Sequence, residues 1–207
     1  MTRTEYYSRM EFLAGEVRDR FGLSPERVTK RDFARIFRAE GVRLDRWRGP
    51  LKRLRGAYFN DDLGPTIMVN AALPDDPYIF TLGHELKHHL VDAGSILSYC
   101  DASNESAMVE IGAEVFAAEL LFSESAFRQQ LESLGVVPPN CTAEHLVHLK
   151  HRTQTTLSYS GLAKRTMRLG FAREGSLPNG GWRRIEDSLY PNPFRRRGVG
   201  ARVLRPG

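Results

Sequence analysis

The stretch YIFTLGHELKHHLV, residues 78–91, decides the fold of the centre of the chain. It contains no proline, and its apolar residues recur often enough to place it half inside a hydrophobic core. We therefore predict a helix over residues 76–92. Its core-facing side chains are apolar and large: Ile79, Phe80, Leu82, Leu86 and Leu90.

Two histidines and a glutamate in this helix follow the spacing H-E-x-x-H: His84, Glu85 and His88. Residues four positions apart on a helix lie on one face one turn apart, so both imidazoles can reach a single metal ion. A catalytic zinc site uses three protein ligands and leaves one position open for water. Glu85 would be the general base that takes a proton from that water. The spacing predicts zinc, and manganese is the other ion that such nitrogen and oxygen donors accept.

The third ligand has to come from another part of the chain. The extended motif with a third histidine would place it at position 94, which is Gly94. A carboxylate is the alternative, and the apolar helix predicted over 106–122 contains Glu110, Glu114 and Glu119. A carboxylate in a buried helix is costly unless it is paired or binds a metal. On a helical wheel Glu110 lies at the flank of the core face and is the first candidate; Glu114, one turn further, is the second, and it could instead orient a histidine.

Other segments complete an α+β pattern around this helix. Charged and apolar residues alternate over 42–44, and the runs RGAYFN and TIMVN are rich in aromatic and β-branched residues, so we predict an antiparallel three-stranded meander. Thr29 and Asp32 form a capping box at the start of a helix. The further helices predicted from apolar spacing cover residues 7–21, 29–41, 126–134, 143–152 and 158–169.

Composition places the chain among soluble proteins. It has 207 residues, 41% of them hydrophobic and 27% charged, and no apolar run long enough to span a membrane, so we expect a cytoplasmic protein without membrane contact. Cys100 and Cys141 are too few for a disulfide framework and are expected as reduced thiols. The net charge is +5, but residues 61–173 are acidic, with 8 Lys and Arg against 14 Asp and Glu. The positive charge lies on both flanks of the segment that holds the H-E-x-x-H motif.

The residues of this segment resemble the ImmA/IrrE family of zinc metallopeptidases. Members have a strand that ends in asparagine, a helix with Phe-Thr-Leu-small-His-Glu and a later helix with E-x-x-A-x-x-F-A-x-x-L-L. Here these patterns are IMVN at 67–70, FTLGHE at 80–85 and EIGAEVFAAELL at 110–121. The resemblance covers about residues 41–172, because residues 145–170 resemble the closing helix pair of the family.

By position, the resemblance implies that His84, His88 and Glu110 bind zinc and that Glu85 is the catalytic base. Lys87 stands where the family usually has glycine. The implied fold is α+β: a mostly helical, zincin-like catalytic domain with the small antiparallel sheet packed on the H-E-x-x-H helix, plus a C-terminal helix pair. We divide the chain into N-terminal helices (1–40), a catalytic domain with the helix pair (41–173) and a basic, flexible tail (174–207).

The resemblance also implies a function. Members cleave helix-turn-helix transcriptional repressors, often in response to DNA damage or another stress. A zinc endopeptidase of this kind would have a repressor as its substrate and partner and would derepress stress-response or mobile-element genes. The basic flanks could add weak contact with nucleic acid.

Other functions compete with this one. The main alternative is a DNA-binding or anti-repressor protein with a structural metal and no proteolysis, and a third is a zinc hydrolase that acts on a small molecule.

His145, His148 and His151 diverge around their helix and are expected on a solvated face. A second group that stabilises the oxyanion is usual in zinc peptidases, and the sequence leaves four candidates for it: Tyr99, His148, His151 and Tyr159.

Overall fold

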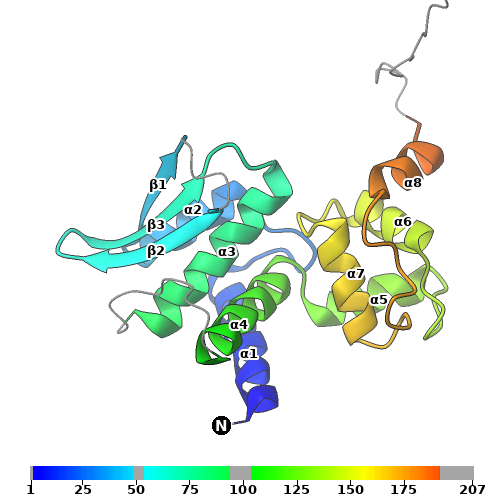
Figure 1. Cartoon of the computed structure of the whole chain (residues 1–207), viewed down its shortest axis with the longest axis horizontal. Coiled ribbons are helices and arrows are strands. Elements are labelled where there is room, and N and C mark those ends of the chain that lie inside the picture. Colours follow the sequence, from blue (N-terminus) through cyan, green and yellow to red (C-terminus); the bar gives the residue numbers. More distant parts are fainter. Residues whose placement is uncertain (1, 49–53, 94–103, 192–207) are drawn as a thin grey trace, which may run out of the picture.

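Eight helices and three strands make up the described parts of the chain, which are residues 2–48, 54–93 and 104–191 of the computed structural model (Figure 1). The elements are α1 (Arg3–Phe21), α2 (Lys30–Ala39), β1 (Arg43–Trp47), β2 (Gly56–Asp61), β3 (Gly64–Asn70), α3 (Asp75–Asp92), α4 (Asn104–Leu121), α5 (Glu124–Ser133), α6 (Ala143–Thr153), α7 (Tyr159–Arg168) and α8 (Trp182–Leu189). The prediction of a mostly helical α+β chain is confirmed.

The first two helices begin and end at residues that the sequence marks for these roles. Thr2 and Glu5 form a capping box at the start of α1, and Gly22 ends that helix in the left-handed conformation. The predicted capping box of Thr29 and Asp32 is present at the start of α2. Local polar chemistry therefore fixes both helix starts.

The three strands form a mixed sheet in the order β1-β3-β2, so the predicted antiparallel meander is wrong. β2 and β3 make an antiparallel hairpin in which Asp61 pairs with Gly64, but β1 runs parallel to β3. β3 takes the centre because it carries the β-branched run, with Thr66, Ile67 and Val69 buried. β1 consists mainly of exposed side chains and forms an edge.

Helix α3 lies between the sheet and helix α4 (Figure 1). It packs on β2 and β3, as predicted for the H-E-x-x-H helix. On its other side, the backbones of α3 and α4 approach closely at Gly83, where a Cβ atom would lie 3.3 Å from the Cβ of Ala117. Two small residues at the crossing thus bring the two helices together beside the motif.

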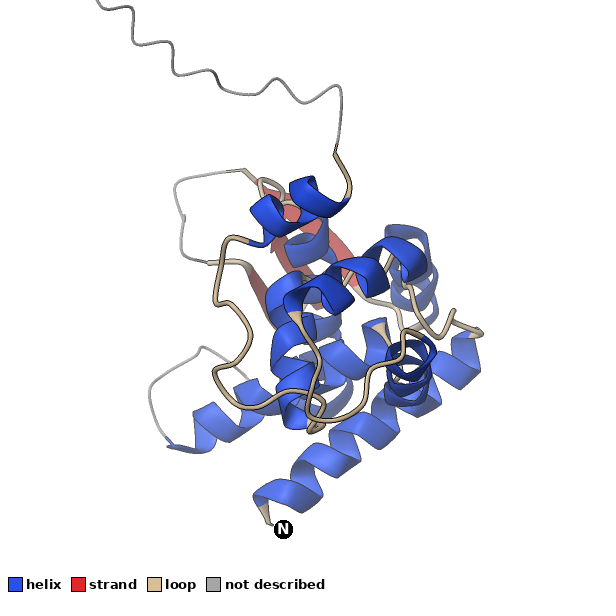
Figure 2. Cartoon of the chain, turned by 90° about the vertical axis from the view of Figure 1, so that its right-hand side faces the viewer, coloured by secondary structure: helices blue, strands red, loops and turns tan. Residues whose placement is uncertain are grey.

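Helices α5 to α8 form the other end of the molecule, which Figure 2 views face on with the strands behind the helices. The expected flexible tail differs from the structure over residues 182–189, which form α8. Trp182 is buried and stacks on Tyr159, with ring centroids 5.3 Å apart, and Glu186 accepts hydrogen bonds from Tyr159 and His151. The prediction failed because the glycines, prolines and arginines of this region outweighed the helical spacing of Trp182, Ile185 and Leu189, which all pack on the core. Residues 192–207 lie outside the described residues.

One hydrophobic cluster joins the three segments into which the sequence was divided. Its buried members come from α1 (Met10), from the centre (Leu86, Phe116) and from α8 (Trp182). None of the helices in the described ranges is long and apolar enough to cross a membrane.

Candidate metal centre

Three side chains from two helices converge at one point: His84 and His88 of α3 and Glu110 of α4. The Nε2 atom of His84 lies 3.1 Å from one carboxylate oxygen of Glu110 and 3.3 Å from Nε2 of His88. The Nε2 atom of His88 lies 3.5 Å from the other oxygen of Glu110. One donor atom of each side chain thus lies within 4.8 Å of the others. The structure brings together the three residues that the sequence assigned to a metal ion.

The spacing and charge of this cluster suit a divalent cation. Ligand atoms about 2.0–2.1 Å from a tetrahedral zinc ion lie roughly 3.3 Å from one another, which is close to the separations above. Burial lowers the pKa of His84, but its hydrogen bond to Glu110 and the surrounding carboxylates outweigh burial and raise that pKa above its ordinary value. The cluster therefore attracts positive charge, and its two imidazoles and one carboxylate are donors that zinc prefers.

Two further residues, Asp92 and Lys87, lie behind the cluster, and neither of them was assigned a role at the site from the sequence. Asp92 accepts a hydrogen bond from Nδ1 of His88, 2.7 Å away, and another from the ammonium of Lys87, also 2.7 Å away. Histidines that bind a metal commonly donate their second nitrogen to a carboxylate in this way. The available signal was a carboxylate four residues after the second histidine, one helical turn further on the same face.

Glu85 lies beside the cluster inside the protein. The residue is 6% exposed. Burial raises the pKa of Glu85, and the positive charges of His84 and His88 oppose this only in part. Gly56 of β2 leaves room for the carboxylate, because a Cβ atom there would lie 2.7 Å from Oε1 of Glu85. A carboxylate with a raised pKa is a good acceptor and donor of a proton near neutral pH.

The other two carboxylates of α4 lie elsewhere. The side chain of Glu114 is 53% exposed and lies 3.7 Å from the ammonium of Lys164. Glu119 accepts hydrogen bonds from the guanidinium of Arg165 and the backbone N–H of Glu124. Of the three candidates for the third ligand, only Glu110 joins the histidines.

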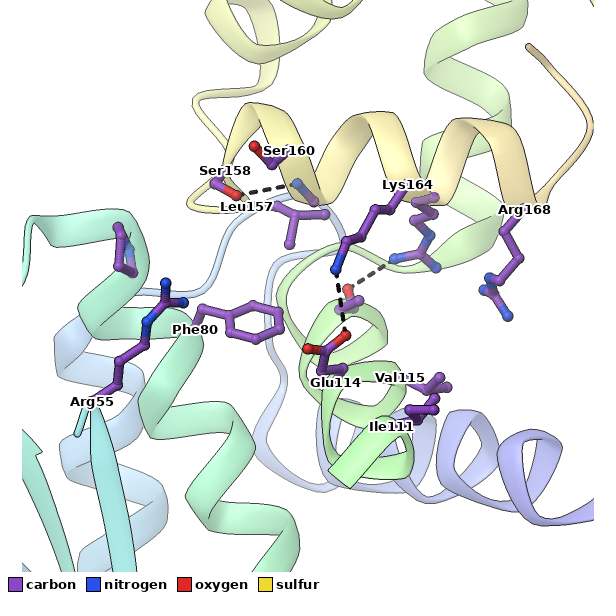
Figure 3. A pocket seen from close by; sticks show the side chains of 14 residues that line it. Arg55, Phe80, Ile111, Glu114, Val115, Leu157, Ser158, Ser160, Lys164 and Arg168 are labelled. Atoms are coloured by element: carbon purple, nitrogen blue, oxygen red, sulfur yellow. Dashed lines mark hydrogen bonds and ion pairs between the residues drawn. The ribbon is translucent and has the colours of Figure 1, made fainter. Parts of the chain in front are cut away.

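A groove with a volume of about 430 Å³ opens between α3 and α4 on one side and α7 on the other (Figure 3). Its lining does not include His84, His88 or Glu110. Phe80 precedes His84 by one helical turn and Glu114 follows Glu110 by one turn, so the groove lies about one turn away from the cluster. Its apolar wall consists of Phe80, Ile111, Val115 and Leu157, and its charged lining residues are Arg55, Glu114, Lys164, Arg165 and Arg168.

The candidates for a second oxyanion-stabilising group have other contacts. His148 bonds to the hydroxyl of Tyr190 at 2.7 Å, and His151 stacks on the ring of Tyr190 with centroids 3.8 Å apart. Tyr159 and His151 both bond to Glu186. These side chains therefore hold α8, and the expectation that the histidines of α6 are merely solvated is wrong for two of them. Tyr99 lies outside the described residues.

Comparison with known proteins agrees with the geometry. A search of curated proteins found no significant match. Residues 38–137 match the family described as Peptidase_M78, IrrE N-terminal-like domain. The matched segment contains the whole sheet, α3 and α4, and with them His84, Glu85, His88 and Glu110. The resemblance predicted from the sequence is confirmed over this segment: residues 38–137, just under half of the chain, match the ImmA/IrrE family, Peptidase_M78.

Proposed function

We propose that this protein is a zinc-dependent endopeptidase that cleaves a helix-turn-helix transcriptional repressor and so derepresses stress-response or mobile-element genes. One observation carries the proposal: His84, His88 and Glu110 converge, with Glu85 beside them, inside a segment that belongs to a metallopeptidase family. A protein that acts on repressors would work in the cytoplasm, where they bind DNA.

His84, His88 and Glu110 would hold the zinc ion. Zinc bound there would polarise the carbonyl of the scissile peptide bond and lower the pKa of the attacking water. Glu85 accepts a proton from that water and later donates it to the leaving amine. The raised pKa of Glu85, caused by burial, suits both transfers. Asp92 holds Nδ1 of His88 and so directs Nε2 of the same ring toward the cluster.

The surroundings of Glu85 offer a place for an extended peptide. β2 is an edge strand of the sheet, and its first residue, Gly56, lies against Glu85. An extended peptide can add to such an edge through main-chain hydrogen bonds. From there it would continue into the groove of Figure 3, whose apolar wall accepts side chains of the substrate. An open groove suits a protein substrate better than the closed pocket expected of a hydrolase for small molecules.

Three variants of the purified protein test the roles of these residues. Glu85→Gln should keep zinc and lose cleavage, since it removes only the proton acceptor. Glu110→Gln should lose zinc and cleavage together. Glu114→Gln is the matched control, because it makes the same change one turn further along α4, and it should keep zinc. Zinc is measured by elemental analysis, and cleavage is measured by mass spectrometry on each helix-turn-helix repressor encoded beside this gene.

The same experiment separates the proposal from its alternative. Cleavage of one repressor at one peptide bond, abolished by Glu85→Gln, supports the peptidase. A stable complex with the repressor without cleavage, or DNA binding that weakens steeply with salt, would instead show the anti-repressor or DNA-binding protein. Full cleavage by Glu85→Gln would refute the assigned role of Glu85.

A further inference from the structure

Lys87 is a buried charged residue next to the candidate metal centre. Its side chain is 0% exposed, and a lysine is almost never buried to this extent unless its charge is paired. The ammonium is 2.7 Å from Oδ2 of Asp92 and 3.2 Å from the backbone carbonyl oxygen of Val109. It also lies 5.6 Å from the ring centroid of Tyr6 in α1. The charge is therefore compensated within the protein.

The partners of Lys87 connect it to the ligands on both helices. The oxygen of Asp92 that accepts from Lys87 also accepts from Nδ1 of His88, so the lysine fixes the carboxylate that orients this histidine. Val109 directly precedes Glu110 in α4. The bond from Lys87 to the carbonyl of Val109 therefore links α3 to α4 at the residue next to the third candidate ligand. An apolar side chain of equal length would fill the same space but would make neither bond.

We infer that Lys87 and Asp92 are positioning residues that set the geometry of the metal centre: Asp92 orients His88, and Lys87 fixes Asp92 and the backbone next to Glu110. The inference rests on the proposed function only in that His84, His88 and Glu110 bind a metal ion. Neither residue has to touch the substrate.

The chain offers a matched control for a buried lysine. Lys150 of α6 has a side chain that is 16% exposed, and its ammonium lies 2.8 Å from a carboxylate oxygen of Asp76. It also donates to the backbone carbonyls of Thr155 and Leu157. Lys150 thus makes the same kinds of bond as Lys87, but it contacts none of the three candidate ligands in the described parts of the chain.

The test measures zinc affinity by competition with a chromophoric chelator, for the full chain and for Lys87→Met, Asp92→Asn, the double variant and Lys150→Met. Loss of such supporting contacts typically weakens metal binding by about 10–100-fold. We expect a loss in this range for Lys87→Met and Asp92→Asn, and little change for Lys150→Met. Lys87→Met should also have a smaller effect in the Asp92→Asn background than in the wild type, because part of its action passes through Asp92.

A second readout reports geometry directly. The visible spectrum of bound cobalt(II) depends on the arrangement of its ligands, so it should change in Lys87→Met and Asp92→Asn and stay unchanged in Lys150→Met. Equal zinc affinity and equal cobalt spectra in the wild type and both variants would overturn the inference while the proposed peptidase stands. If Lys87→Met does not fold, Asp92→Asn alone decides by the same two measurements. A wild-type protein that binds no zinc would refute the proposed function itself.

Discussion

Gly56 determines how much space the proposed general base has. A Cβ atom at this position would lie 2.4 Å from Cγ2 of Thr81 and 2.7 Å from Oε1 of Glu85, so Gly56→Ala must displace both side chains or shift β2. We expect Gly56→Ala to lower kcat at least tenfold with zinc content unchanged, and to destabilise the fold by about 1–3 kcal/mol through overpacking. Peptide cleavage, elemental analysis and thermal unfolding measure the three quantities.

Gly15 provides the control for this substitution. It lies within α1, and a Cβ atom there would meet no other atom within 4 Å. Gly15→Ala should leave cleavage unchanged and stabilise the helix by about 0.5–1 kcal/mol. If Gly56→Ala cleaves as fast as Gly15→Ala, then the catalytic position of Glu85 does not depend on the absence of a side chain at Gly56.

The sequence predicted the residues of the candidate metal centre better than it predicted the residues that hold them in position. The spacing of His84, Glu85 and His88 depends only on helix geometry, and the wheel position of Glu110 depends only on which face of α4 is apolar, so both can be read from the chain. Their roles in zinc binding and proton transfer stay predictions. Lys87 and Asp92 could not be selected in this way, because their burial depends on α1 and α4 packing around α3.

At the scale of elements, the same distinction between local and tertiary causes explains why the pairing of β1 and the helix α8 were predicted wrongly. The other strands and helices lie where the local sequence patterns predicted them. The parallel pairing of β1 with β3 was missed because it joins segments that are not neighbours in the sequence. α8 was missed because the surrounding glycines, prolines and arginines were taken to indicate a tail, although Trp182, Ile185 and Leu189 follow helical spacing. Contacts of Trp182 and Glu186 with Tyr159 and His151 hold the helix in place.

Those contacts predict that α8 is part of the fold. Trp182→Ala removes a buried ring and its stacking on Tyr159, so it should lower the free energy of unfolding by about 3 kcal/mol. Arg183→Ala, at a side chain that is 75% exposed, is the control and should change stability by less than about 0.5 kcal/mol. Thermal unfolding of both variants checks this. A chain that ends at Arg173 should melt below one that ends at Pro191, whereas equal melting temperatures for all of these proteins would restore the expectation of a dispensable tail.

At the scale of the whole molecule, α4 packs between α1 and α3 and is bonded at its end to α7. α1 lies along it so closely that a Cβ atom at Gly112 would lie 2.4 Å from the ring of Tyr6. Arg18 of α1 donates to the carbonyl of Leu120 at 2.5 Å, and Arg165 of α7 donates to the carbonyl of Ala118 at 2.8 Å. The carbonyl of Leu120 lies in the last turn, where carbonyls lack partners within the helix, and that of Ala118 also accepts from the backbone N–H of Phe122. Both arginines therefore stabilise the end of α4.

This arrangement predicts that the family-matched segment does not fold alone. A fragment of residues 38–137 keeps the cluster of His84, His88 and Glu110 but lacks α1, α6 and α7. It would expose the buried apolar side chains at the end of α4 and remove both arginines, so it should lack a cooperative thermal transition by circular dichroism and bind zinc weakly. A fragment of residues 1–191 should unfold cooperatively and bind zinc like the full chain. A sharp transition in the shorter fragment would show that the segment has a sufficient core of its own and that α1 and α7 only cover it.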